Sequence, residues 1–326
     1  MANGDDLLLT VRDLKVVYTS RKKTVHAVNG VSFHVRRGET LALVGETGAG
    51  KTTIAKSILR ILPHPPARVL GGEILLGDTD LLKCSEREML EIRGARVAMV
   101  FQDPMSALNP LMSVGDQIAE SILLHKRCSE AQALKEAKEL LETVGIPGQR
   151  ASEYPFQFSG GMKQRVVIAM ALACNPQLLL ADEPTTALDV TIQAQVLELI
   201  SELKAKYGAA MILITHDLGV VAQTCDRVAV VYAGQIVEYG SKKDIFVNCA
   251  HPYTHGLFAS LPSMSQDSHR LKPIPGSPPD PTALPQGCVF HPRCSFATED
   301  CKSRPVPLRE IAPGHFCRCW NITQEG

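Results

Sequence analysis

The sequence predicts an α/β fold in which helices cover a parallel sheet, and two observations lead to this prediction. The short apolar run at residues 40–44 is followed by a glycine-rich loop and by a segment, residues 52–62, whose apolar side chains recur at helical spacing. From residue 178 to residue 232, apolar runs of strand length alternate with a helical pattern. Such alternation is typical of a parallel sheet whose strands are connected by helices.

The other elements follow from the same patterns and from turn residues. Residues 113–173 are expected to be helical, with one helix that begins at the capping box of Ser129 and ends before Gly145. A later helix at residues 191–206 is ended by Gly208. Strand-like stretches are expected at residues 7–19, 31–35, 69–82, 97–101, 178–181, 211–215 and 228–232.

The character of the chain changes past residue 263, where the sequence becomes rich in proline and irregular. A change of this kind marks a tail or a small appended module. We therefore expect a main domain at residues 1–262, with a helical subdomain at about residues 104–173, and a small irregular, cysteine-rich module at residues 263–326.

The composition excludes several functional classes. The 326 residues are 45% hydrophobic and 21% charged, which is ordinary for a globular protein. The formal net charge of +0 argues against electrostatic capture of nucleic acid or anionic lipid. No apolar run approaches the ~20 residues that span a bilayer, and the first residues lack the pattern of a signal peptide. We expect a cytosolic protein whose membrane role would come through partners.

The glycine-rich loop carries the strongest functional signal. It reads Gly-Glu-Thr-Gly-Ala-Gly-Lys-Thr and matches G-x-x-x-x-G-K-(S/T), the Walker A phosphate loop. Lys51 is expected to reach the β- and γ-phosphates and Thr52 to hold Mg²⁺. A chance match in a glycine-rich turn is the alternative, which the strand before and the helix after the loop disfavour. The residues expected to contact the nucleotide are Gly45, Glu46, Thr47, Gly48, Ala49, Gly50, Lys51, Thr52 and Thr53.

Two adjacent carboxylates end the apolar run that begins at residue 178. Asp182 is expected to hold Mg²⁺ through water, and Glu183 to orient or deprotonate an attacking water molecule. The alternative is solvated charge without a role. The apolar residues before the pair and the stop at Pro184 make the functional interpretation the stronger one.

Three weaker signals lie at the ends of other elements. Ser159, Gly160 and Gly161 precede a helical run, where a hydroxyl and glycine amides form an anion site. Gln102 ends a strand and is expected to reach the metal and water. His216 ends another strand near the expected γ-phosphate, although a histidine in such a place is usually only a polar residue with satisfied hydrogen bonds.

Taken in order, these motifs resemble the ATP-binding subunit of an ABC transporter over about residues 7–255. The set is GETGAGKT, Gln102, FSGGM, LLLADE, ALD at residues 187–189, and His216. The resemblance implies a RecA-like P-loop ABC nucleotide-binding domain with an antiparallel β subdomain and a helical subdomain. It also implies ATP and Mg²⁺ as cofactors, and a dimer in which FSGGM of one subunit closes over ATP on the Walker A loop of the other.

The resemblance implies individual roles as well. Tyr18 would stack on adenine, Gln102 would sense the membrane-spanning subunits, and His216 would orient the γ-phosphate. Met162 departs from the broad pattern, in which many members have glutamine, and fits a peptide-importer subgroup.

Three further stretches resemble the ATPases of oligopeptide, dipeptide and nickel importers: residues 101–110, residues 251–255 and the tail around residues 274–294. The D-type subunit is the nearest type. It implies an ATPase that lies at the cytoplasmic face of the membrane and energises the uptake of peptides into the cell. Its partners would be an F-type ATPase subunit, two transmembrane permease subunits and an extracytoplasmic substrate-binding protein, with no nucleic acid. Nickel or another solute as cargo, and a non-transport ABC ATPase, are the alternatives.

Five of the 10 cysteines crowd into the last 39 residues, with a spacing that lacks the paired C-x2-C of structural zinc sites. Disulfides would be unusual in the cytosol. The resemblance to D-type subunits implies a 4Fe–4S cluster bound by Cys288, Cys294, Cys301 and Cys319, with Cys317 as a spare or as a rival for the fourth position. Zinc or free thiols are the alternatives.

Overall fold

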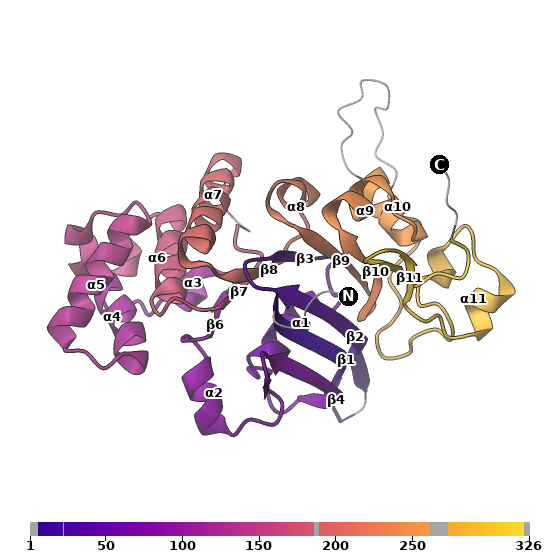
Figure 1. The fold of residues 1–326 in the computed structure, drawn as a ribbon, viewed down its shortest axis with the longest axis horizontal. Helices are drawn as coiled ribbons and strands as arrows, with labels where there is room; N and C mark the ends of the chain where they lie inside the picture. Colours follow the sequence, from indigo (N-terminus) through magenta and orange to yellow (C-terminus); the bar gives the residue numbers. More distant parts are fainter. Residues whose placement is uncertain (1–5, 22, 186–188, 261–272, 323–326) are drawn as a thin grey trace. The chain divides into compact units, whose positions relative to one another are not determined.

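The computed structural model describes residues 6–21, 23–185, 189–260 and 273–322. The chain forms two compact units, each built from several stretches of sequence. The first contains residues 1–9, 35–40 and 76–215, and the second contains residues 10–34, 41–75 and 216–326. Figure 1 shows the elements of both. Among the described helices, none is both long and apolar enough to cross a bilayer.

The first unit is centred on three parallel strands in the order β6-β7-β8. They are β6 (Val97–Val100), β7 (Leu178–Asp182) and β8 (Ala210–Ile214). Every residue of these strands is buried, which explains why they appear in the sequence as continuous apolar runs. The strands predicted at these places are confirmed to within one or two residues. The helix α7 (Val190–Tyr207) connects β7 to β8 and ends at Gly208, as predicted.

The helical region of the first unit lies between β6 and β7. Its helices α4 (Val114–His125) and α5 (Glu130–Thr143) pack side by side (Figure 1). Small and apolar side chains recur every four residues on the buried face of α5, at Ala133, Ala137 and Leu141. The other helical elements of the unit are α2 (Glu86–Ile92), α3 (Pro104–Ala107), η2 (Gly148–Ser152), η3 (Pro155–Gln157) and α6 (Gly160–Leu172).

The second unit is centred on five neighbouring strands in the order β3-β9-β10-β12-β11. β3 (Thr40–Val44) and β9 (Arg227–Tyr232) are parallel, and β10 (Gln235–Ser241) is antiparallel to β9. Most of a smaller sheet, in the order β2-β1-β4, also belongs to this unit. Its strands are β1 (Leu7–Thr19), β2 (Thr24–Arg36) and β4 (Ala67–Leu76), followed by the two-residue β5 (Thr79–Asp80).

The helices of the second unit are short. They are α1 (Lys51–Ile58), α8 (Leu218–Thr224), α9 (Lys242–Val247), α10 (Pro252–Ala259) and α11 (Glu299–Ser303), with the turn η4 (His291–Arg293) in the tail.

The expectation of an irregular tail is wrong for its last part. β11 (Arg309–Ala312) and β12 (His315–Cys317) form a hairpin, and β12 pairs antiparallel with β10, with Tyr239 opposite Phe316. These strands are only four and three residues long, too short for their alternation to be recognised in the sequence. The tail therefore extends the sheet of the second unit instead of forming a module of its own.

A buried carboxylate joins β10 to the tail. Glu238 has no exposed surface, and its Oε1 lies 2.8 Å from Nε2 of His315 on β12. The backbone N–H groups of Ala250 and His251 donate to the two carboxylate oxygens at 2.7 and 3.1 Å. Removal of this carboxylate would leave three buried polar groups without an acceptor, which is costly in a protein interior.

We therefore expect Glu238→Ala to lower the free energy of unfolding by about 3 kcal/mol. Urea denaturation followed by circular dichroism measures the change. Glu202→Ala, at an exposed position of α7, is the matched control and should be nearly neutral. Equal stability of the two variants would show that the contact does not anchor the tail.

Candidate functional site

The phosphate loop (residues 45–52) connects β3 to α1 and passes close to two other backbone segments of the second unit. Gly45 has φ 148° and Gly50 has φ 104°, both in the region that favours glycine. A Cβ atom at Gly45 would lie 2.1 Å from the carbonyl oxygen of Val231, and one at Gly50 would lie 2.4 Å from that of Ala27. No other residue type fits these two positions, so the glycines of the motif are required by packing as well as by conformation.

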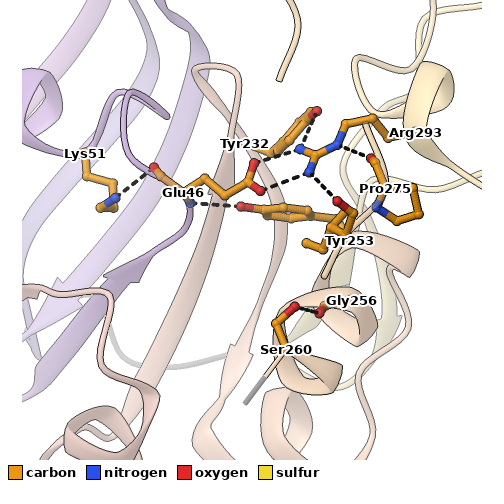
Figure 2. Close-up of polar contacts among 9 residues, drawn as sticks. Glu46, Lys51, Tyr232, Tyr253, Gly256, Ser260, Pro275 and Arg293 are labelled. Carbon is orange, nitrogen blue, oxygen red and sulfur yellow. Dashed lines mark hydrogen bonds and ion pairs between the residues drawn. The ribbon is translucent and has the colours of Figure 1, made fainter. Parts of the chain in front are cut away.

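Lys51 begins α1 and is buried within the loop. Its Nζ donates to the carbonyl oxygens of Gly45 at 2.7 Å and Glu46 at 3.0 Å, the second of which Figure 2 shows. The ammonium group is thus held beside the loop by acceptors that phosphate oxygens can replace. This geometry is consistent with the predicted role of Lys51.

Tyr18 and Thr53, both predicted to contact the nucleotide, lie together. The Tyr18 hydroxyl is 3.3 Å from Oγ1 of Thr53 in the first turn of α1. Tyr18 belongs to β1, so this contact places the end of β1 beside the helix that follows the phosphate loop. His216, also predicted to contact the nucleotide, lies two residues after the end of β8, and its side chain is exposed.

In the first unit, the structure brings together three of the predicted residues at the carboxyl ends of β6 and β7. Nε2 of Gln102 donates to Oε2 of Glu183 at 2.8 Å. Asp182, the last residue of β7, is 3% exposed. Carboxylate oxygens are among the ligands that Mg²⁺ prefers, so the residue types at the carboxyl end of β7 fit this ion.

The backbone at Glu183 is a feature that sequence patterns did not predict. Its φ is 46°, a left-handed conformation that costs free energy for a residue with a side chain. The N–H of Glu183 donates to the carbonyl oxygen of Ile214 at 2.8 Å, which holds this conformation. Strained backbone at a predicted catalytic residue is typical of functional sites.

The FSGGM segment forms the start of α6. Ser159 is the N-cap, and its hydroxyl accepts the N–H of Met162. Ser159 and Gly160 are exposed at the N-terminus of a 13-residue helix, and Gly161 is half-buried. Ala187 and Leu188 of the ALD motif lie outside the described residues.

The four cysteines predicted as cluster ligands do not form a metal site as they are arranged. Among the residues that the structure describes, no three or more His, Cys, Asp or Glu side chains are placed to hold a metal ion. Burial raises the pKa of the Cys288 and Cys294 thiols, and that of Cys319 to about 11. The Cys319 thiol donates a hydrogen bond to the carbonyl of Asn321, and the Cys301 thiol is hydrogen-bonded to the Thr298 hydroxyl. This arrangement does not support the prediction of a 4Fe–4S cluster.

No sequence pattern predicted the polar network around Glu46. The Glu46 carboxylate receives two hydrogen bonds from Arg293 of the tail, and the Glu46 N–H donates to the Tyr253 hydroxyl (Figure 2). Glu46 occupies a position that the Walker A motif leaves open, and Arg293 is 247 residues away. No local pattern could have connected the two.

Comparison with known proteins agrees with this geometry. The family model described as "ABC transporter" matches residues 28–186, and the one described as "Oligopeptide/dipeptide transporter, C-terminal region" matches residues 237–301. A solved ATP-binding cassette, MJ0796, in a dimeric post-hydrolysis state bound to ADP and Pi, superposes with a TM-score of 0.65 at 26% identity. The superposition covers 72% of this chain and 98% of the MJ0796 chain.

Curated relatives match almost the whole chain. The probable peptide ABC transporter ATP-binding protein y4tR of Sinorhizobium fredii is 52% identical over 98% of this chain and 96% of its own length. The dipeptide transport ATP-binding protein DppD of Bacillus subtilis is 52% identical over 96% of this chain and 94% of its own length. The oligopeptide transport ATP-binding protein OppD of Escherichia coli is 45% identical over 98% of this chain and 95% of its own length. The chain belongs to the ATP-binding subunits of the ABC transporter family, within the group that has the oligopeptide/dipeptide transporter C-terminal region.

Proposed function

We propose that this chain hydrolyses ATP to energise the import of di- or oligopeptides, as one of two ATP-binding subunits attached to a membrane permease. The observation that carries the proposal is the phosphate loop, in which the buried Lys51 lies beside two carbonyl oxygens at the start of α1. The names of the relatives and the match of the C-terminal region support peptides as the cargo.

In the proposed reaction, Lys51 leaves the loop carbonyls and donates to the β- and γ-phosphate oxygens of ATP. Thr52 and Asp182 would hold Mg²⁺, and the ion would supply positive charge beside the phosphate oxygens. Glu183 takes a proton from the attacking water, and the amide of Gln102, which donates to Glu183, orients that carboxylate. The proposed role of Tyr18 is to stack on adenine, and that of His216 is to orient the γ-phosphate.

The remaining residues act across a dimer. Ser159, Gly160 and Gly161 at the start of α6 would contact the ATP held by the phosphate loop of the second subunit. The dimeric state of the MJ0796 cassette supports this arrangement. We propose an F-type ATPase, two transmembrane permease subunits and an extracytoplasmic substrate-binding protein as partners, and a peripheral position at the cytoplasmic face of the membrane. The ATPase domain would comprise residues 1–262, with the tail, residues 263–326, attached to it through β12.

Glu183→Gln should bind ATP with about wild-type affinity and hydrolyse it on the order of 10²–10⁴-fold more slowly, because the amide cannot accept the proton. Phosphate release and binding of a fluorescent ATP analogue, measured on the purified chain with its partner subunit, separate the two effects. Lys51→Ala is the control variant and should lose nucleotide binding itself. If Glu183→Gln hydrolyses ATP at the wild-type rate, Glu183 does not take the proton from water.

For the tail we propose the ligand set that the resemblance implies, formed after the thiols lose their protons. Cys319 lies within electrostatic range of Cys288, Cys294 and Cys301, which supports it as the fourth ligand. Burial and then the charge of Glu238 raise the pKa of Cys317, which also has Cys319 and Cys288 as electrostatic neighbours and lies in one buried cluster with Cys319 and Ala250.

Anaerobically purified chain should therefore contain iron and acid-labile sulfide in equal amounts. Cys319→Ser should lose both and Cys317→Ser should keep both, since only the first removes a ligand. Chain that contains zinc without sulfide, or neither metal, contradicts the cluster.

A further inference from the structure

The tail contributes one buried cation to the phosphate loop, and this cation is fully hydrogen-bonded. The guanidinium of Arg293 has five N–H donors, and the structure gives an acceptor for each. Two go to the Glu46 carboxylate at 2.7 and 3.0 Å, and one each to the carbonyls of Pro275 at 2.8 Å and Ile274 at 3.3 Å. The fifth goes to the Tyr232 hydroxyl at 3.3 Å (Figure 2).

Burial strengthens the electrostatic interaction between Arg293 and Glu46. The Arg293 side chain is 4% exposed and that of Glu46 is 28% exposed, so solvent screens the pair only weakly. The hydrogen bonds that Arg293 donates to the Glu46 carboxylate hold the pKa of Arg293 above its usual range. The guanidinium also lies 5.7 Å from the ring centre of Tyr232 and 6.0 Å from that of Phe290. Loss of the Glu46 charge would leave a buried guanidinium without its counter-ion, and loss of Arg293 would leave the half-buried carboxylate unpaired.

Arg293 is one of three groups that fix the second residue of the phosphate loop. Arg293 binds the side chain of Glu46, while the Glu46 N–H donates to the hydroxyl of Tyr253 at 2.9 Å. Tyr253 is fully buried on α10, and burial raises the pKa of its hydroxyl, which stays neutral. The Glu46 carbonyl accepts from Lys51. All the polar groups of residue 46 are therefore engaged.

The tail also lines one side of the loop. A cavity of about 180 Å³ is bounded by residues 46–49 of the loop and by residues 232–234. Its remaining lining comes from His26 and from three prolines of the tail, Pro278, Pro279 and Pro281. The N–H of His26 donates to the carbonyl of Pro281 at 2.8 Å, which holds this part of the tail in place.

We propose that Arg293 is a positioning residue for nucleotide binding, through which the C-terminal tail presets the phosphate loop. The inference rests on the proposed function, because it requires that residues 45–52 bind ATP. Arg293 acts in two ways. It holds the side chain of Glu46, whose N–H and carbonyl are held by Tyr253 and Lys51, before the nucleotide arrives. It also neutralises a carboxylate that would otherwise repel the phosphates.

The direct test is R293Q in the full chain, with ATP binding and steady-state hydrolysis as the readouts. We expect the Kd and KM for ATP to rise about tenfold while kcat changes little, because the loss affects binding and not the chemical step. R304Q is the matched control. Arg304 is an exposed arginine of the same tail, paired with the exposed Asp300, and its loss should leave Kd within about twofold.

A double variant separates repulsion by the uncompensated Glu46 carboxylate from a general loss of structure. E46Q/R293Q removes the uncompensated carboxylate together with the cation, so its Kd should return toward the wild-type value. Additive loss in the double variant, or a wild-type Kd in folded R293Q, overturns the proposal. Should R293Q fail to fold, R293K keeps the charge but cannot make the two-pronged contact, and a wild-type Kd in that variant overturns the proposal equally. Wild-type chain that binds no ATP would instead contradict the proposed function.

Discussion

The close approach of the phosphate loop to neighbouring backbone is the constraint on which the rest of the nucleotide site depends. Gly45 and Gly50 lie against the carbonyls of Val231 and Ala27 with no room for a side chain. The loop therefore needs β9 on one side and β2 on the other, and both strands need their own sheets. Lys51 can be buried only because the curled loop turns two carbonyls toward its ammonium group. The core of the second unit is thus what makes the loop rigid.

Sequence patterns predicted the elements that are determined by their own residues and their immediate neighbours in the chain. β7 and β8 are buried on both faces, so their apolar runs marked them almost residue by residue. Glycine after a helix and serine before one likewise marked the ends of α7 and α5. Elements whose stability comes from distant partners were missed. β12 has three residues, and it is a strand because it pairs with β10 and because Glu238 holds His315.

The same distinction applies to the site. The phosphate loop, Asp182 and Glu183 could be identified as candidates because the chemistry requires residue types at fixed spacing after a strand. The left-handed backbone of Glu183 and the contact from Arg293 to Glu46 depend on packing that no spacing encodes. The cysteines are a case in which residue types alone predict less. The cluster is implied by the resemblance, and in the structure burial raises the pKa of the Cys288 and Cys319 thiols while Cys319 donates a hydrogen bond to the carbonyl of Asn321. Residue types indicate what a site could bind, and surroundings decide its state.

The central claim, that ATP hydrolysis at this site drives peptide uptake, is tested most directly in the native host. Uptake of radiolabelled di- and oligopeptides is compared between cells carrying the wild-type chain and cells carrying Glu183→Gln, in a strain without a redundant importer. The account predicts that uptake is lost in the variant, and the peptide lengths affected distinguish a dipeptide from an oligopeptide importer. Unchanged peptide uptake, with loss of nickel or another solute, would contradict the claim.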